Sequence, residues 1–279
     1  MNDFSLKGKV AVITGGAGII CSEMARSLAS QGVITVLLGR TLEKLDKVAD
    51  DIKQKYGTAS LGIKADVLDR ASLENAKKTI NEKIGSIDIL VNGAGGNSPK
   101  ATTKIERMDG SEKQLDETFF GLDVEGFQDV FDLNFKGTLL PTMVFATDMI
   151  QKKSGNIINI SSMNSYRPLT KIAAYSASKA AVNNFTQWLA VHFAKTGVRV
   201  NAIAPGFLLT EQNRFLLINE STGEQTPRCK KILANTPMDR FGTPEEMTGT
   251  LLYLVSDLSR FVTGVVIPVD GGFSAFSGV

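Results

Sequence analysis

Tyr175 and Lys179 are the side chains whose types and spacing most clearly suggest chemistry. If their segment is helical, residues four apart share a face, so a phenol and an ammonium would be neighbours. A free phenol has a pKa of about 10, but an adjacent cation favours the phenolate. Lowering that pKa by ~3 units requires about 4 kcal/mol of differential interaction. The pair is a candidate for proton transfer, although this spacing also occurs on ordinary solvated helix faces.

The elements that would position this pair follow from the hydrophobic pattern. Short β-branched runs, near-continuously apolar, alternate with stretches of helical periodicity, which predicts a parallel sheet covered by helices on both faces. The expected strands span 10–13, 33–38, 60–65, 87–91, 156–160, 198–203 and 265–269. The expected helices span 21–30, 42–56, 71–84, 127–151, 173–194 and 244–255.

Composition narrows the functional classes. A chain of 279 residues with 43% hydrophobic residues suits one large α/β domain, and its net charge of +2 does not suggest a nucleic-acid partner. Two cysteines exclude a disulfide framework, and a single histidine argues against a zinc site, so no metal is expected. No apolar stretch approaches about 20 residues and no signal-peptide pattern opens the chain, so we expect a cytoplasmic protein without a membrane partner.

Two polar segments interrupt the alternation of strands and helices. Residues near 97–125 and 207–242 are far longer than ordinary connections and follow the carboxyl ends of expected strands. Ligands of open α/β sheets bind at those ends, so the two segments are expected to be substrate loops. Without an internal linker or repeat, residues 1–279 are interpreted as a single domain.

A glycine-rich turn indicates nucleotide binding. Thr14, Gly15 and Gly18 directly follow the first strand and open a helix, where glycines admit a pyrophosphate and the helix N-terminus favours its charge. The second strand ends in Gly39 and Arg40, and an arginine there can meet the 2′-phosphate of NADP(H). The cofactor is thus NADP(H) or NAD(H), with a slight preference for NADP(H), because Arg40 could instead face solvent beside NAD(H).

In their order along the chain, these motifs resemble those of the short-chain dehydrogenase/reductase family over essentially the whole length. The family's motifs match Thr14-Gly15 with Gly18, Asp66, Asn92-Gly93-Ala94-Gly95, Asn134, Ser162, Tyr175 with Lys179, and Pro205-Gly206. Ser162 is preferred over Ser161 because it lies thirteen residues before Tyr175 (175 − 162), as is usual in the family. The resemblance implies a Rossmann-type, doubly wound parallel sheet of about seven strands.

Two positions depart from the family pattern. Ile19 and Cys21 replace the last two glycines of the turn, and the β-carbon of Cys21 lies where helix and strand normally pack tightly. Gly93 replaces the second asparagine of the usual Asn-Asn-Ala-Gly. Neither change removes a group that would take part in the chemistry.

The resemblance also implies roles for individual residues. Tyr175 would exchange a proton with the substrate oxygen, Lys179 would lower the Tyr175 pKa, and Ser162 would hold the oxygen. Asn134 would hold a water that links Lys179 to solvent, which completes the catalytic set. The implied cofactor-binding residues are Thr14, Gly15, Gly18, Ile20, Arg40, Asp66, Val67, Asn92, Ala94, Gly95, Tyr175, Lys179, Pro205, Gly206 and Thr210.

Polar and cationic residues surround the expected substrate position. Those singled out as substrate-binding are Asn97, Lys100, Asn164, Arg167 and Arg214. Such surroundings suit a hydroxylated anion better than a steroid or an acyl chain. Segments 92–103, 131–135 and 204–214 are similar to those of sugar-acid oxidoreductases in the family, which implies interconversion of a keto sugar acid and its hydroxy acid, D-fructuronate and D-mannonate first among them.

Other readings of the same motifs remain open. A gluconate 5-dehydrogenase-like or polyol dehydrogenase would use the same groups, and a nucleotide-sugar epimerase would need a longer C-terminal region. A non-catalytic dinucleotide sensor is disfavoured because Ser162, Tyr175 and Lys179 are all present. By resemblance we expect a homotetramer, and His192 is interpreted as a packing or interface residue rather than a general base.

Overall fold

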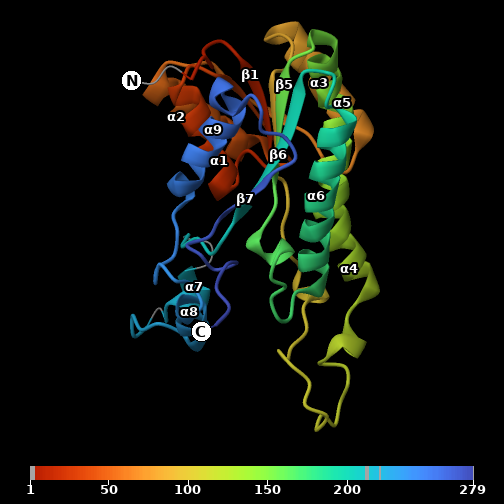
Figure 1. The fold of residues 1–279 in the computed structure, drawn as a ribbon, viewed down its shortest axis with the longest axis vertical. Coiled ribbons are helices and arrows are strands. Elements are labelled where there is room, and N and C mark those ends of the chain that lie inside the picture. The colour runs from red at the N-terminus through yellow and green to blue at the C-terminus, as the bar shows by residue number, and fades with distance from the viewer. Residues whose placement is uncertain (1–3, 211–213, 220, 279) are drawn as a thin grey trace.

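The computed structural model describes residues 4–210, 214–219 and 221–278. Its centre is a seven-stranded parallel sheet in the order β3-β2-β1-β4-β5-β6-β7 (Figure 1). The strands are β1 (Val10–Thr14), β2 (Ile34–Gly39), β3 (Ser60–Lys64), β4 (Ile89–Asn92), β5 (Gly155–Ile160), β6 (Val198–Pro205) and β7 (Val266–Val269). The strand order reverses between β1 and β4, where Thr14 is paired with Asn92. The predicted Rossmann-type α/β fold is confirmed.

Helices cover both faces of the sheet, because each strand in the middle is buried on both sides (Figure 1). One face carries α1 (Ile19–Ser30), α2 (Leu42–Tyr56) and α9 (Thr248–Val255). The other carries α3 (Arg70–Lys83), α4 (Val124–Phe131), α5 (Gly137–Lys152) and α6 (Ala173–His192). None of the helices in the described ranges is long and apolar enough to span a bilayer.

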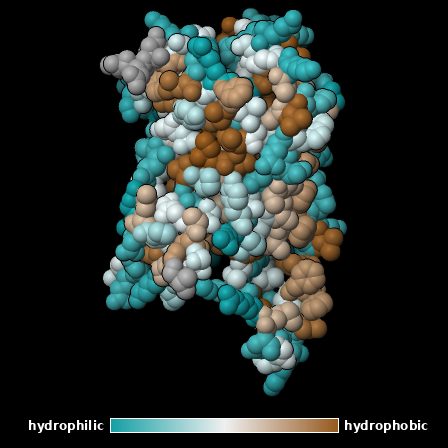
Figure 2. Space-filling model, viewed as in Figure 1, coloured by the Kyte–Doolittle hydropathy of each residue, from teal (hydrophilic) through white to brown (hydrophobic). Residues whose placement is uncertain are grey.

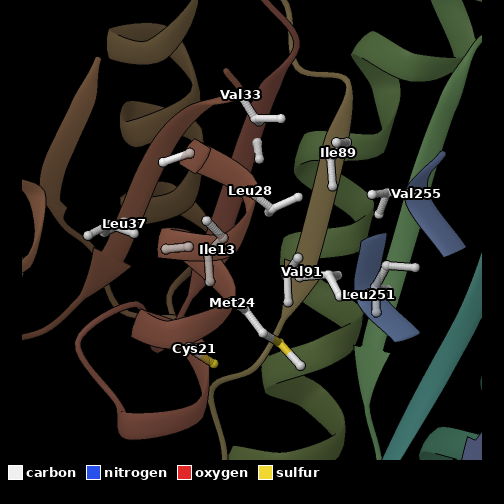
Figure 3. Packing of buried hydrophobic residues seen from close by; sticks show 14 of the residues in the cluster. Ile13, Cys21, Met24, Leu28, Val33, Leu37, Ile89, Val91, Leu251 and Val255 are labelled. Carbon is white, nitrogen blue, oxygen red and sulfur yellow. The ribbon is translucent and has the colours of Figure 1, made fainter. Parts of the chain in front are cut away.

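The apolar core beneath α1 fixes the start of that helix against the sheet. Met24 and Leu28 point from α1 toward Ile13 of β1 and Val91 of β4, and Leu251 of α9 packs beside them (Figure 3). All five side chains are fully buried. Burying a side chain of this size contributes about 1.5–3 kcal/mol, so the β1 carboxyl end and the following turn are held rigidly.

The expected helix over 127–151 is instead three consecutive elements. α4 runs into the π-helix η3 (Asp132–Lys136), which continues into α5. Asn134 lies in η3, and its Nδ2 donates to the carbonyls of Val130 at 2.8 Å and Gly96 at 2.7 Å. π-helical turns are frequent at functional sites, and this one turns an amide side chain toward the end of β4.

The two long segments lie beyond the carboxyl edge of the sheet. The first projects as a yellow loop below α4, and the second contains the short helices α7 (Arg214–Leu217) and α8 (Pro227–Ala234), which hydrophobic periodicity did not predict (Figure 1). Pro227 and the Thr226 cap begin α8, and Thr226 Oγ1 accepts from Cys229 N at 3.1 Å. In the space-filling view the first segment ends in a hydrophilic tip at the bottom of the molecule (Figure 2).

Candidate active site

A cleft of about 570 Å³ opens where the strand order reverses, at the carboxyl ends of β1, β2 and β4. This is where open α/β sheets bind dinucleotides. Of the predicted cofactor residues, the cleft is lined by Gly15, Gly18, Ile20, Arg40, Ala94, Gly95, Gly206 and Thr210. It is also lined by Thr41, Lys44, Phe207 and Leu208, which no sequence motif had indicated as cofactor residues.

The turn after β1 leaves no room for a side chain at Gly15. Its φ of +65° favours glycine, and a β-carbon there would lie 3.1 Å from the backbone of Ala94. Thr14 holds the opposite wall, because its Oγ1 accepts from the amides of Gly93 at 3.0 Å and Ala94 at 3.2 Å. The backbone cradle fits the close approach of a pyrophosphate.

Cys21 and Gly93, which both depart from the family pattern, lie next to one another, and the Cys21 thiol fills the space that a side chain at position 93 would need. A β-carbon at position 93 would overlap Cys21 Sγ, so the missing side chain of Gly93 makes room for the thiol. Cys21 is buried, and burial raises the pKa of its thiol to about 12, so it is neutral at physiological pH. The thiol therefore fills the cleft floor as a small apolar group.

Ser162 and Tyr175, two of the predicted catalytic residues, lie next to one another. Ser162 precedes the short helix η4 (Met163–Ser165), and its side chain hydrogen-bonds that of Tyr175. Burial raises the pKa of Tyr175, and the hydrogen bond with Ser162 opposes this rise. Ser161 contacts Asn183 and Ser165 instead. The structure thus pairs Tyr175 with the serine that the family spacing indicates.

Lys179 lies beside the phenol, yet the pKa of Tyr175 is raised and not lowered as expected from the sequence, because burial outweighs the effects that favour the phenolate. Its Nζ is 5.7 Å from the centre of the Tyr175 ring and donates to the carbonyl of Ile160 at 2.7 Å. Because the ammonium is buried, the pKa of Lys179 falls to about 8. At neutral pH the phenol is consequently protonated and the amine is close to its own titration point.

Gly95 brings Asn134 and Lys179 together. A β-carbon at position 95 would lie 2.6 Å from Asn134 Oδ1 and 3.3 Å from Lys179 Nζ, so both polar groups approach the same stretch of backbone. Asn134 Oδ1 also accepts from Gly96 N at 3.1 Å. The end of β4 therefore joins the cofactor cleft to the catalytic groups.

The other predicted cofactor residues lie around or behind this cleft. Asp66 Oδ1 accepts from Leu68 N at 2.9 Å, while Asp69 caps α3. Asn92 Nδ2 donates to Thr142 of α5 and to Asn159 of the neighbouring strand β5, both at 2.9 Å. Val67 is buried next to α5, and Pro205 ends β6.

The predicted substrate residues differ in their surroundings. Asn164 lies two residues after Ser162, is 5% exposed, and its Oδ1 has no hydrogen-bond partner among the described atoms. Arg167 donates to the carbonyl of Ser274 at 3.1 Å, and Asn97 to Thr102 at 3.1 Å. Lys100 and Arg214 are exposed on η1 (Pro99–Ala101) and α7. Asn164 is the one with an unmet hydrogen-bonding need.

Two features lie outside the cleft. His192 stacks on Trp188 with ring centres 4.8 Å apart on the surface of α6, remote from Tyr175 in the sequence. Within the described ranges, no group of three or more histidine, cysteine, aspartate or glutamate residues is arranged to hold a metal ion.

Comparison with known proteins agrees with this geometry. The short chain dehydrogenase family model matches residues 9–220, and the chain belongs to that family. It is therefore an oxidoreductase of the nicotinamide-dependent short-chain class.

The chain is 53% identical over 276 residues to the Bacillus subtilis uncharacterized oxidoreductase UxuB, covering 99% of this chain and 98% of that one. A crystal structure of a provisionally named D-mannonate oxidoreductase from Haemophilus influenzae, with bound NAD, is 51% identical with a TM-score of 0.94, and 99% of each chain is covered. A gluconate 5-dehydrogenase from Burkholderia cenocepacia, in complex with NADP and tartrate, is 29% identical with a TM-score of 0.82, and 98% of each chain is covered.

Proposed function

We propose that this protein interconverts a keto sugar acid and its hydroxy acid, with D-fructuronate and D-mannonate as the substrate pair. The observation that carries the proposal is the hydrogen-bonded pair of Ser162 and Tyr175 with buried Lys179 at the end of a dinucleotide-sized cleft. The similarity to the provisionally named D-mannonate oxidoreductase supports the choice of substrate.

The proposed mechanism assigns one task to each side chain. The bound nicotinamide supplies or accepts the hydride. In reduction, the Tyr175 Oη proton passes to the substrate oxygen, because burial keeps this phenol protonated at neutral pH. Ser162 Oγ hydrogen-bonds the same oxygen and stabilises the charge that develops on it.

Lys179 and Asn134 restore the proton. The Lys179 ammonium stabilises the phenolate that Tyr175 becomes, and with a pKa of about 8 it can pass on a proton at low cost. Asn134 holds the η3 turn against Gly96, and we propose that a water bound at this turn links Lys179 to solvent. We propose that these two residues reprotonate Tyr175 between turnovers.

Asn164 supports a hydroxylated substrate. A buried amide oxygen without a partner costs about 1–3 kcal/mol, and a substrate hydroxyl would satisfy it. We propose that Asn164, Asn97, Lys100, Arg167 and Arg214 form the substrate-binding set. The long segments near 97–125 and 207–242 of the proposed single domain 1–279 supply three of its members, Asn97, Lys100 and Arg214. Arg167 comes from the turn before α6, where it contacts the carbonyl of Ser274.

The cofactor proposal follows from the end of β2. Arg40 and Lys44 line the cleft there, and its described lining contains no carboxylate to accept a ribose 2′-hydroxyl. We propose that the enzyme accepts NADP(H) as well as NAD(H), the cofactor bound in the Haemophilus influenzae structure.

A substrate panel tests the reaction. D-Fructuronate, 5-ketogluconate and neutral ketoses are offered with NADH or NADPH, and absorbance is followed. We expect D-fructuronate to give the highest kcat/KM, and Tyr175→Phe to lower kcat by about 10²–10⁴-fold while Tyr56→Phe, on α2, leaves it unchanged. A preference for 5-ketogluconate would select the gluconate 5-dehydrogenase alternative, and full activity in Tyr175→Phe would refute the mechanism.

We also propose that the protein is a homotetramer and that it is cytoplasmic. Trp188 is 57% exposed and Val191 is 78% exposed on α6, a face that a homotetramer would cover. Both cysteines are free and buried, which suits a reducing cytoplasm. Sedimentation of the purified chain tests the tetramer.

A further inference from the structure

A second cavity of about 380 Å³ lies next to the cofactor cleft, with which it shares Phe207. Its walls come from four parts of the chain that are distant in sequence: residues 102–107 of the first long segment, the turn 167–172, Phe207 with residues 228–235 of the second segment, and Phe273 with Phe276 near the C-terminus. Ile172 in its wall lies three residues before Tyr175. The cavity is therefore close to the pair of Ser162 and Tyr175 without containing it.

Positive charge dominates this cavity. Five cationic side chains line it, against the single carboxylate of Glu106: Arg107, Arg167, Lys171, Arg228 and Lys231. Glu106 is already paired with Lys231, whose hydrogen bond lowers the pKa of Glu106.

Three of the cations make no ion pair with a described residue, although Arg107 and Lys171 lie near enough to Glu106 to contribute to its lowered pKa. Within the described ranges, the side chains of Arg107, Lys171 and Arg228 make no ion pair or hydrogen bond, and Arg167 bonds only the carbonyl of Ser274. Like charges gathered without partners repel one another, and a bound anion would relieve that repulsion.

The backbone at Lys171 is strained in a way that fixes the cavity. Its φ of +75° is unusual for a residue with a side chain and costs on the order of 1–3 kcal/mol. Its carbonyl accepts from Thr103 N at 3.0 Å, which ties the first long segment to the turn before α6. Strain held in place by such contacts is characteristic of binding sites, and here it positions the wall that carries Arg107.

We propose that this cavity binds the carboxylate of the substrate, with Arg107 and Arg228 as a two-sided clamp and Lys171 beneath them. The inference rests on the proposed sugar-acid function and adds the residues that recognise the acid. Guanidinium groups suit a planar carboxylate because they offer two parallel donors. Since Arg107 and Arg228 come from different long segments, one substrate group would engage both loops at once.

The experiment compares Arg107→Ala and Arg228→Ala with Lys230→Ala, which removes a cation of α8 that does not line the cavity. For the sugar acid, we expect each arginine variant to raise KM about 10–100-fold with kcat within about threefold, and Lys230→Ala to change neither. For a neutral polyol in the oxidative direction, all three should match the parent. Glu106→Gln frees Lys231 and should lower KM for the sugar acid.

Calorimetric titration with D-mannonate provides a readout apart from turnover. We expect heat of binding in the parent and Lys230→Ala, and a 10-fold or greater loss of affinity in the arginine variants. If D-mannonate is bound and turned over but the arginine variants behave as Lys230→Ala does, the carboxylate site is wrong and the proposed function stands. If no sugar acid is bound or turned over, the proposed function fails, and tighter binding of a sugar phosphate by the same arginines would replace the carboxylate with a phosphate.

Discussion

Gly93 and Cys21 should behave as a coupled pair. A β-carbon at position 93 would overlap Cys21 Sγ, and its next neighbour would be the carbonyl oxygen of Thr14 at 3.1 Å. In Gly93→Ala the thiol must therefore move against the buried base of α1, whereas in Cys21→Ala the space that the new methyl needs becomes free. The pair can be tested by a double-mutant cycle.

The expected changes in the free energy of unfolding follow from this steric overlap. Overpacking a buried site typically costs about 1–3 kcal/mol, and Gly93→Ala should lie at the upper end because the overlap is with a buried atom. Removing the sulfur alone should cost about 1 kcal/mol, as for a lost methylene-sized group. The double variant should cost about as much as Cys21→Ala alone, which gives a coupling of roughly 3 kcal/mol in magnitude, the full cost of Gly93→Ala.

Urea unfolding and cofactor titration measure the two consequences. Because Cys21 and Gly93 both line the cofactor cleft, the Kd for NAD(P)H should rise in Gly93→Ala and return toward the parent value in the double variant. If the loss of unfolding free energy in the double variant equals the sum of the two single losses to within about 0.5 kcal/mol, and cofactor binding does not recover, then the two residues do not share this space.

Two further predictions concern the amine and the end of β2. In the reductive direction Tyr175 and Lys179 must both be protonated, so kcat/KM should be flat below the Lys179 pKa of about 8 and fall above it. In Lys179→Arg, the fall in kcat/KM should move to higher pH. An unchanged pH profile of kcat/KM would exclude Lys179 as the group whose titration causes the fall. Removing a cation at the end of β2, in Arg40→Ala, should raise KM for NADPH about 10-fold and leave KM for NADH within twofold; an equal effect on both would mean that Arg40 does not meet a 2′-phosphate.

The elements with local signals were predicted best. The helix over 42–56 was placed with both ends correct because it has an amphipathic pattern, and Gly57 ends it in a left-handed conformation. The helix over 127–151 was predicted as continuous, since the Asn134 contacts that accompany the π-helix reach Gly96, 38 residues away. α7 and α8 were not predicted, because short helices in polar segments show little hydrophobic periodicity.

Some residues of the candidate site could likewise be predicted from local sequence signals, and others could not. Ser162, Tyr175 and Lys179 could be named from their order and spacing, and the structure brings them together. Lys44, Arg107 and Arg228 could not be singled out, because each is one of many exposed cations until the fold places it in a wall. The direction of the Tyr175 pKa shift also depends on burial, which spacing does not reveal.

The amino-acid sequence by itself determined the parallel sheet and the glycine-rich turn, and it singled out the candidates for proton transfer. These depend on short-range patterns: strand hydrophobicity, a glycine-rich turn, and residues one helical turn apart. Tertiary structure alone decided that Cys21 fits into the space left by Gly93, that Lys179 is buried to a pKa of about 8, and that two distant loops share a cationic cavity. Desolvation, steric fit and summed charge depend on which segments, distant in sequence, come into contact, and those contacts exist only in the folded chain.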